Sequence, residues 1–157
     1  MSKRPILLGV MISLVFIATA SAAGPTGEWL VAERTARISI ADCGGALWGV
    51  VSWEADPGGV DDKNPDTAKR GRPTLGMPIL LGMKERGANQ WAGQIYNSDN
   101  GKTYSGGLTL INPDLLRVRG CIFLILCGGE NWTRAALTAQ DKNLSEGAIC
   151  ASDNISR

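Results

Sequence analysis

Short segments in which apolar and polar residues alternate, separated by tight turns, constrain the fold of this chain more than any other feature. In the range 35–41, the apolar residues Ala36, Ile38 and Ile40 alternate with polar neighbours, which is the period of a strand with one buried face. Asn100-Gly101 separates two further segments of this kind and is typical of a two-residue hairpin turn. The sequence therefore predicts an all-β fold.

Seven to nine such segments, joined mostly by short turns, predict an antiparallel sandwich or barrel. We expect a meander β-barrel, because strands that follow one another in the chain can then pair, and closure removes the exposed edges. The clearest expected strands are 27–31, 35–41, 46–53, 77–84, 90–97, 102–110, 115–121 and 131–137.

One long loop interrupts this pattern over 54–76. Asn64 followed by Pro65 predicts a short helical turn there, with Asn64 as its N-cap. The turn ends near Arg72, because Pro73 restricts the backbone of the residue before it. Loops that interrupt a rigid sheet often carry function, so this loop is the first place to look for a site.

The 157 residues are enough for one hydrophobic core and too few for two ordinary domains. Lys3 and Arg4 precede an apolar run over 6–18 and then small residues, which is the pattern of a secretory signal peptide cleaved after Ala22 or Ala23. The expected division is a signal peptide over 1–22, a β-barrel domain over 23–140 and a polar C-terminal tail over 141–157 that is loose except where Cys150 tethers it.

The apolar run is shorter than the roughly 20 residues that a membrane-spanning helix needs. No cysteine directly follows the cleavage position to carry a lipid. We therefore expect a periplasmic or secreted protein with no stable membrane anchor after cleavage. Loss of Lys3 and Arg4 lowers the formal charge from +1 to −1, and this near-neutrality gives no electrostatic basis for binding nucleic acid.

All four cysteines, Cys43, Cys121, Cys127 and Cys150, follow the signal. An even number in a small exported domain favours disulfides over free thiols. Three pairings are possible, and the sequence does not choose among them. Cys121 with Cys127 is preferred, because the residues between them can form the tip of a tight connection, which leaves Cys43 with Cys150. Zinc is the competing interpretation, but the chain has no histidine and no C-x-x-C pair, so we expect no metal.

The absence of histidine also excludes Ser/His/Asp and Cys/His catalysis. Carboxylate pairs such as Asp61 with Asp62, or Glu28 with Asp42, leave a histidine-independent hydrolase open. Nothing in the sequence fixes the geometry of either pair. We therefore expect a protein that is not an enzyme and that needs no cofactor.

Trp29 lies in a Gly-x-Trp motif on the first expected strand, and Trp132-Thr133-Arg134 lies on the last. In a closed meander these strands are neighbours, so Arg134 can lie across the Trp29 ring in a cation–π contact. The pair resembles the Gly-x-Trp motif and closing arginine of the lipocalin and fatty-acid-binding-protein barrels. This resemblance implies structural roles for Trp29, Trp132 and Arg134 at one end of a lipocalin- or calycin-like barrel.

A longer series of motifs runs through nearly the whole mature chain. The motifs are Gly27-x-Trp29, Asp42-Cys43-Gly44-Gly45-Ala46-Leu47-x-Gly49, Asn64-Pro65-Asp66, Arg70-x-Arg72-Pro73-x-Leu75-Gly76, Trp91-x-Gly93-x-Ile95-Tyr96, Asp99-x-Gly101-Lys102-x-Tyr104, Val118-x-Gly120-Cys121 and Trp132-Thr133-Arg134. Their order resembles that of a bacterial secreted family, domain-of-unknown-function family 2147. The resemblance implies a secreted bacterial barrel with no established activity. Position 48, often cysteine in that pattern, is Trp48 here, which removes a local partner for Cys43.

Three tryptophans, Trp48, Trp53 and Trp91, are candidates to line a ligand cavity, because apolar pockets are walled mainly by aromatic and aliphatic groups. Aromatic residues on strand faces more often belong to a core. Both interpretations stay open from the sequence.

Arg70 and Arg72 of the long loop are candidates to bind a carboxylate or phosphate of a ligand through their planar guanidinium groups. The alternative, which the sequence favours, is that they pair with nearby aspartates and hold the loop against the barrel. Tyr104, just after the hairpin turn, is a candidate for the rim of a cavity, with a place in the strand core as the alternative.

The sequence thus predicts a barrel that binds a small apolar or amphipathic ligand. A non-catalytic envelope scaffold that contacts other proteins is the alternative, and a hydrolase has less support. A ligand-sized cavity would favour the first interpretation, and a barrel packed solid would favour the second.

Overall fold

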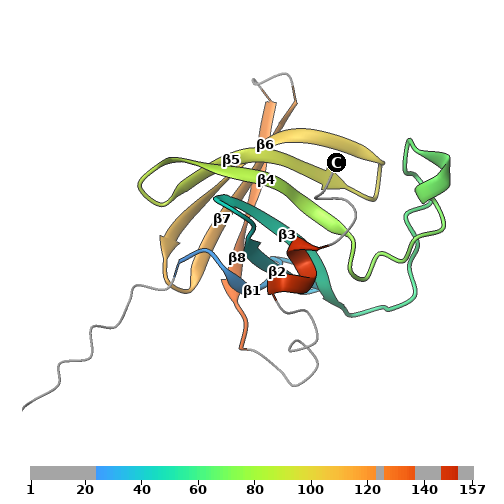
Figure 1. Cartoon of the computed structure of the whole chain (residues 1–157), viewed down its shortest axis with the longest axis horizontal. Helices are drawn as coiled ribbons and strands as arrows, with labels where there is room; N and C mark the ends of the chain where they lie inside the picture. Colours follow the sequence, from blue (N-terminus) through green and yellow to red (C-terminus); the bar gives the residue numbers. More distant parts are fainter. Residues whose placement is uncertain (1–23, 123–125, 137–145, 152–157) are drawn as a thin grey trace, which may run out of the picture.

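The computed structural model describes residues 24–122, 126–136 and 146–151. Within them, eight antiparallel strands form one closed barrel in which each strand pairs with the next along the chain (Figure 1). The strands are β1 (Gly27–Leu30), β2 (Ala36–Asp42), β3 (Ala46–Glu54), β4 (Pro78–Gly87), β5 (Gln90–Asn97), β6 (Lys102–Asn112), β7 (Leu115–Ile122) and β8 (Leu126–Arg134). The predicted all-β meander barrel is confirmed.

The first and last strands close the barrel. Trp29 and Leu30 of β1 pair with Arg134 and Thr133 of β8. This seam is short, because β1 has only four residues. The two ends of the sequence pattern therefore lie side by side, as a closed meander requires.

The last strand begins earlier than the sequence predicted. We expected 131–137, whereas β8 runs over Leu126–Arg134. Cys127 lies directly opposite Cys121 on β7 and is joined to it by a disulfide. The pair Gly128-Gly129 hid the strand, because glycine is disfavoured in strands, but here the ladder and the disulfide hold the pair in place.

The long loop contains a 3₁₀ turn, η1 (Thr67–Lys69), whose N-cap is Asp66 and not Asn64. The Asp66 side chain accepts a hydrogen bond from the Ala68 amide at 3.0 Å. Asn64 acts one step earlier, since its side chain accepts from the Asp66 amide at 2.9 Å. Both are local side-chain caps of the kind that asparagine and aspartate form readily.

The inner face of the barrel carries the hydrophobic core. Inward residues of seven strands are almost fully buried, and Trp91 and Ile95 of β5 pack against them. Most of them follow the period of two. The cluster consists of Trp29, Ile38, Ile40, Leu47, Val51, Leu80, Met83, Leu108, Leu116, Val118 and Trp132.

A second, smaller cluster lies outside the barrel. Ala41 of β2 and Val50 of β3 pack against Ile149 of the short helix α1 (Glu146–Cys150), which Figure 1 shows against these strands. The Cys43–Cys150 disulfide ties this helix to the start of the β2–β3 turn. The prediction of a tail held only by Cys150 was therefore wrong for α1, because Ile149 is buried as well. The rest of the tail lies outside the described residues.

Both disulfides have the pairing that the sequence preferred, Cys43 with Cys150 and Cys121 with Cys127. The expected signal peptide over 1–22 lies outside the described residues. Among the residues that the structure describes, no helix is long and apolar enough to cross a membrane.

The two ends of the barrel differ. Strands β1, β3, β5 and β7 run in the same direction, so they finish at one end, and the loop over 55–77 leaves from it (Figure 1). At the other end the Arg134 guanidinium lies 4.2 Å from the centre of the Trp29 ring. It also donates hydrogen bonds to the carbonyl oxygens of Gly24, Thr26 and Pro113. This second end is therefore closed by the contact that the sequence predicted.

Candidate functional site

A cavity of about 590 Å³ lies at the end of the barrel from which the long loop leaves. Its walls come from strands β2 to β8 and from the β1–β2 and β5–β6 connections. The apolar part of the wall includes Ile38, Val51, Ile79, Ile95, Val118 and Trp132. The volume falls within the range of about 300 to 1,000 Å³ that is usual for small-molecule sites.

The packed core forms the floor of this cavity. Leu108 and Leu116 are almost fully buried but do not line the cavity, whereas Ile38, Val118 and Trp132 belong to both the core and the wall. Side chains alternate between the two faces of a strand. The strand pairing that determines which residues enter the core therefore also determines which residues face the cavity. The barrel is therefore packed at one end and hollow at the other.

Four carboxylates interrupt the apolar wall, namely those of Glu33, Glu54, Asp99 and Glu130. Glu130 of β8 is half-buried, and one of its oxygens accepts a hydrogen bond from the Trp132 indole nitrogen. The Oε2 atom of Glu54 is buried, and no described residue donates a hydrogen bond to it. Among the described residues that line the cavity there is no lysine and no arginine.

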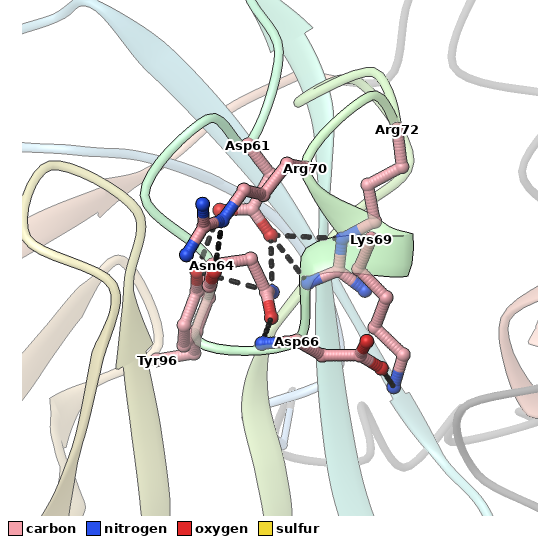
Figure 2. A network of polar contacts seen from close by, with 7 residues as sticks. All are labelled: Asp61, Asn64, Asp66, Lys69, Arg70, Arg72 and Tyr96. Carbon is pink, nitrogen blue, oxygen red and sulfur yellow. Dashed lines mark hydrogen bonds and ion pairs between the residues drawn. The ribbon is translucent and has the colours of Figure 1, made fainter.

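The rim of the cavity carries a polar network centred on Asp61, whose side chain is fully buried (Figure 2). The Tyr96 hydroxyl donates to Asp61 Oδ1 at 2.5 Å. The Asn64 amide donates to Asp61 Oδ2 at 2.6 Å. Arg72 donates to the same oxygen through Nε at 2.9 Å and pairs with it through Nη2 at 2.8 Å. Because Tyr96 also lines the cavity, this network joins the loop to the cavity wall.

The network changes the acidity of two of its members. Burial alone would raise the pKa of Asp61, but the hydrogen bonds from Tyr96, Asn64 and Arg72 and the charge of Arg72 together lower it below 3.8. Burial and the hydrogen bond to the Asp61 carboxylate raise the pKa of Tyr96 to about 12. Asp61 is therefore held as a carboxylate and Tyr96 as a neutral donor over the whole neutral range.

Further contacts fix the loop itself. Arg70 Nε donates to the Asn64 carbonyl oxygen at 2.8 Å, and the Arg72 guanidinium lies 5.8 Å from the centre of the Tyr96 ring. Val60 and Pro73 form an isolated bridge between the two arms of the loop. The loop is thus held by defined partners on both of its arms.

Arg72 has a partner of the kind that the alternative interpretation gave it, because it pairs with Asp61. Arg70 instead donates to the Asn64 carbonyl oxygen of the loop backbone. Neither arginine lines the cavity. Tyr104, by contrast, lines the cavity, and its hydroxyl oxygen accepts a hydrogen bond from the Asn100 side chain at 2.9 Å.

The three candidate tryptophans do not line the cavity. Trp48 lies in the outer cluster with Cys43 and Cys150, because α1 covers that part of β3 from outside. The Trp53 ring lies beneath the Arg37 guanidinium, which is 5.3 Å from its centre. Trp91 packs against the core and borders a smaller hollow of about 320 Å³. The tryptophan in the cavity wall is instead Trp132, to which the sequence assigned a structural role.

The carboxylate pairs that left a hydrolase open do not form a shared site. Asp61 is buried and fully bonded, whereas Asp62 is exposed. Glu28 is buried and accepts a hydrogen bond from the Ser52 hydroxyl at 2.6 Å, and Asp42 accepts one from the Gly45 amide. None of the four lines the cavity. Within the described part of the chain, no group of three acidic or cysteine side chains is arranged to hold a metal ion.

The sequence did not single out Glu54 and Glu130, which bring charge to the wall. Glu130 lies two positions before Trp132 and so shares a face with it, but the last strand was expected to begin only at 131. Glu54 gave no signal, since it falls where the strand pattern ends. Tyr96 stood in a motif, but nothing in its neighbourhood indicated a buried partner 35 positions away.

Comparisons with known proteins agree with this fold. No curated protein matches the chain. A solved structure, described as protein HP1028 from the human pathogen Helicobacter pylori and as belonging to the lipocalin family, superposes with a TM-score of 0.66 at 19% sequence identity. The match covers 77% of this chain and 88% of that one, and it shows that the barrel is lipocalin-like. The family model for uncharacterized proteins conserved in bacteria, DUF2147, matches residues 27–134, so the chain belongs to this bacterial family.

Proposed function

We propose that this protein binds a small apolar or amphipathic molecule in the cavity of its barrel. The observation that carries the proposal is the hollow of about 590 Å³ at one end of a barrel whose other end is packed solid. Protein interiors are normally close-packed, with few voids larger than a water molecule. A void of this size, walled by Ile38, Val51 and Ile95, is therefore best explained by an occupant.

The lipocalin-like neighbour adds support at the level of the fold. Barrels of eight strands have an interior that either fills with side chains or holds one small ligand. The hollow in this barrel favours the second case. Tyr96 and Tyr104 supply polar groups in the wall, and a few placed polar groups among apolar ones are usual for a ligand site.

A binding role without catalysis is the form of this function that the residues support best. The chain has no histidine, and the carboxylate of Asp61 is engaged by three neighbours. A general acid or base must reach the substrate, whereas Asp61 is buried in the rim. We propose no cofactor and no nucleic-acid partner.

The periplasm or the outside of the cell is the proposed location. Two disulfides join the four cysteines, and structural disulfides persist in oxidising compartments. The family is bacterial, and the chain begins with the pattern of an export signal.

The first experiment is native mass spectrometry of protein purified from a bacterial periplasm. We expect a complex heavier than the mature chain that loses a small molecule when the barrel is unfolded. Protein that carries nothing, and that also fails to bind decanol in calorimetry, would contradict the proposal.

A blocking variant locates the binding site. Gly128 lines the cavity, and a side chain added there would meet nothing within 4 Å, so Gly128→Leu fills the hollow without a clash. We expect decanol binding to weaken about tenfold, because each displaced methylene loses about 0.8 kcal/mol. Gly87→Leu is the matched control, since Gly87 is on a strand, has equally open space and does not line the cavity. Equal binding by the two variants would place the ligand elsewhere.

A second function, contact with another envelope protein, is favoured by two exposed apolar residues near the β7–β8 turn. Ile122 is 45% exposed and Leu126 is 71% exposed. Leu126→Lys would disrupt such a contact, and Ile111→Lys at another exposed apolar position is the control. If Leu126→Lys loses a cross-linked partner and Ile111→Lys keeps it, the result supports this function. If Leu126→Lys keeps its cross-linked partner, the result contradicts this function.

A further inference from the structure

We infer that the molecule bound in the cavity is a cation, with an apolar body and an amine or other ammonium group. This inference rests on the proposed function and specifies the chemistry of the ligand. It follows from the charged residues in the described part of the cavity wall, which are all acidic.

The charge of the wall does not reflect the composition of the chain. The whole sequence has 16 basic and 15 acidic residues. Yet the described residues of the wall include four carboxylates and no lysine or arginine. The described part of the wall is therefore acidic although the chain as a whole is nearly neutral.

The carboxylates are distributed along the path that a ligand would take. Glu33 follows β1, Glu54 ends β3 and Asp99 follows β5. Odd-numbered strands all finish at the hollow end, so these three side chains surround the mouth. Glu130 lies deeper, opposite Val118 on the neighbouring strand β7.

Glu130 faces the cavity in a setting that does not suit an isolated carboxylate. It is half-buried, its cross-strand neighbour is Val118, and the hydrogen bond from Trp132 is the one it accepts among the described contacts. A carboxylate partly removed from water is costly unless a cation or several donors compensate it. An ammonium group in the cavity would supply both charge and donors.

Glu54 adds an independent indication. Its Oε2 atom is buried without a hydrogen-bond donor among the described residues, and the residue lines the cavity. Buried polar atoms in native proteins nearly always have a partner. An ammonium group held at the wall would compensate the charge of this carboxylate.

The same wall argues against a fatty acid or another anion. Arg72 at the rim of the cavity and Arg134 at the other end of the barrel are both engaged by protein groups. An anionic head group in the cavity would meet carboxylates without a compensating cation, and like charges repel. The carboxylates are also not grouped as metal ligands in the described chain, whereas an ammonium group needs only one or two of them.

Three probes of equal chain length test the sign of the charge on the native protein. Decylamine carries a positive charge at neutral pH, decanol none and decanoate a negative charge. We expect calorimetry at low ionic strength to show decylamine binding at least about tenfold more tightly than decanoate, with decanol between them. Added salt should narrow this difference.

Two substitutions assign the effect to the wall. Glu130→Gln and Glu54→Gln each keep the size of the side chain and remove its charge, and each should reduce the preference for decylamine over decanol about tenfold. Glu85→Gln is the control, because Glu85 is exposed on β4 away from the cavity, and it should leave this preference unchanged.

The outcomes separate this inference from the function on which it rests. Suppose that decanol binds, that Gly128→Leu weakens this binding, and that decanoate binds as tightly as decylamine. The cavity is then a ligand site, and the inference of a cation is overturned. If none of the three probes binds, both fail.

Discussion

Tyr96 is the residue that connects the two parts of the site. Its ring forms part of the cavity wall, and its hydroxyl donates to the buried Asp61 of the loop. Any change at this position should therefore affect both the stability of the barrel and the position of the loop. The two tyrosines of the chain allow these effects to be measured with an internal comparison.

We predict that Tyr96→Phe lowers the free energy of unfolding by about 1 to 3 kcal/mol, because it leaves a buried carboxylate oxygen without its donor. Tyr104→Phe should cost less than about 1 kcal/mol, since the Tyr104 hydroxyl bonds to Asn100 at an exposed turn. Urea unfolding of the three proteins measures the difference. Equal losses of unfolding free energy in the two variants would show that the Tyr96–Asp61 hydrogen bond adds no more stability than the exposed Tyr104–Asn100 bond.

The same network predicts how stability depends on pH. The pKa of Asp61 is lowered in the folded state, so its contribution is present above 3.8 and is lost as the pH falls through the folded value. The pKa of Tyr96 is raised from 10.0 to about 12, so its contribution is present below pH 10 and is lost as the pH rises from there to about 12. Tyrosinate absorbance should show the late titration in wild type and in Tyr104→Phe, and should lose it in Tyr96→Phe. A late titration that survives in Tyr96→Phe would refute the assignment.

Arg134 closes the packed end of the barrel through geometry as well as charge. It contacts the Trp29 ring and three backbone carbonyl groups. We predict that Arg134→Lys costs about 1 to 3 kcal/mol, because lysine keeps the charge but lacks the planar donor fork. Arg117→Lys, on the exposed face of β7 with one bond to Asn131, should leave the urea midpoint almost unchanged. A similar midpoint for both variants would contradict this role.

At the residue scale, the sequence predicted a contact between two recognisable motifs and missed a contact between a strand and the long loop. The Trp29–Arg134 contact could be predicted, because the motif and a closed meander bring two known positions together. The Tyr96–Asp61 bond could not, since it joins a strand to a loop whose path the sequence does not specify. The inward direction of Glu130 follows from strand alternation only once β8 is known to begin at Leu126, and it is unusual for a carboxylate.

At the scale of the elements, strand positions followed closely from alternation and turn chemistry. The failures lie where local signals were weak or absent. The glycines at the start of β8 concealed its extension to Leu126. The N-cap of η1 is Asp66 and not Asn64, because two residues able to cap lie within three positions and act one after the other. Trp48 was expected inside because β3 is apolar on both faces, but the outer face is covered by α1.

The helix α1 should depend on its disulfide. Cys43 and Cys150 are 107 positions apart, whereas Cys121 and Cys127 are 6 apart. The chain-entropy model predicts a loss of about 4 to 5 kcal/mol for the double variant Cys43→Ser/Cys150→Ser and about 2 kcal/mol for Cys121→Ser/Cys127→Ser. Thermal or urea unfolding of both double variants tests this order. A larger loss for the short bridge would show that hairpin strain or denatured-state structure dominates.

At the scale of the whole molecule, one end of the barrel holds the closing contacts and the other end holds the cavity. The end closed by Trp29 and Arg134 is packed, and the end next to the Asp61 network is hollow and acidic. The sequence predicted the closed barrel, but the three tryptophans that it offered for a cavity wall do not line the hollow. It did not predict the charge of the cavity, because that property depends on which side chains of distant strands face the same space.

The central claim is that this hollow takes up a small molecule. Isoleucine methyl signals in nuclear magnetic resonance test it most directly, because Ile38, Ile79 and Ile95 line the cavity, while Ile111 is exposed and Ile149 belongs to α1 outside the barrel. On titration with decanol, the account predicts that the signals of the first three shift and that those of the last two stay in place. Shifts confined to Ile111 or Ile149, or no shift at all, would contradict it.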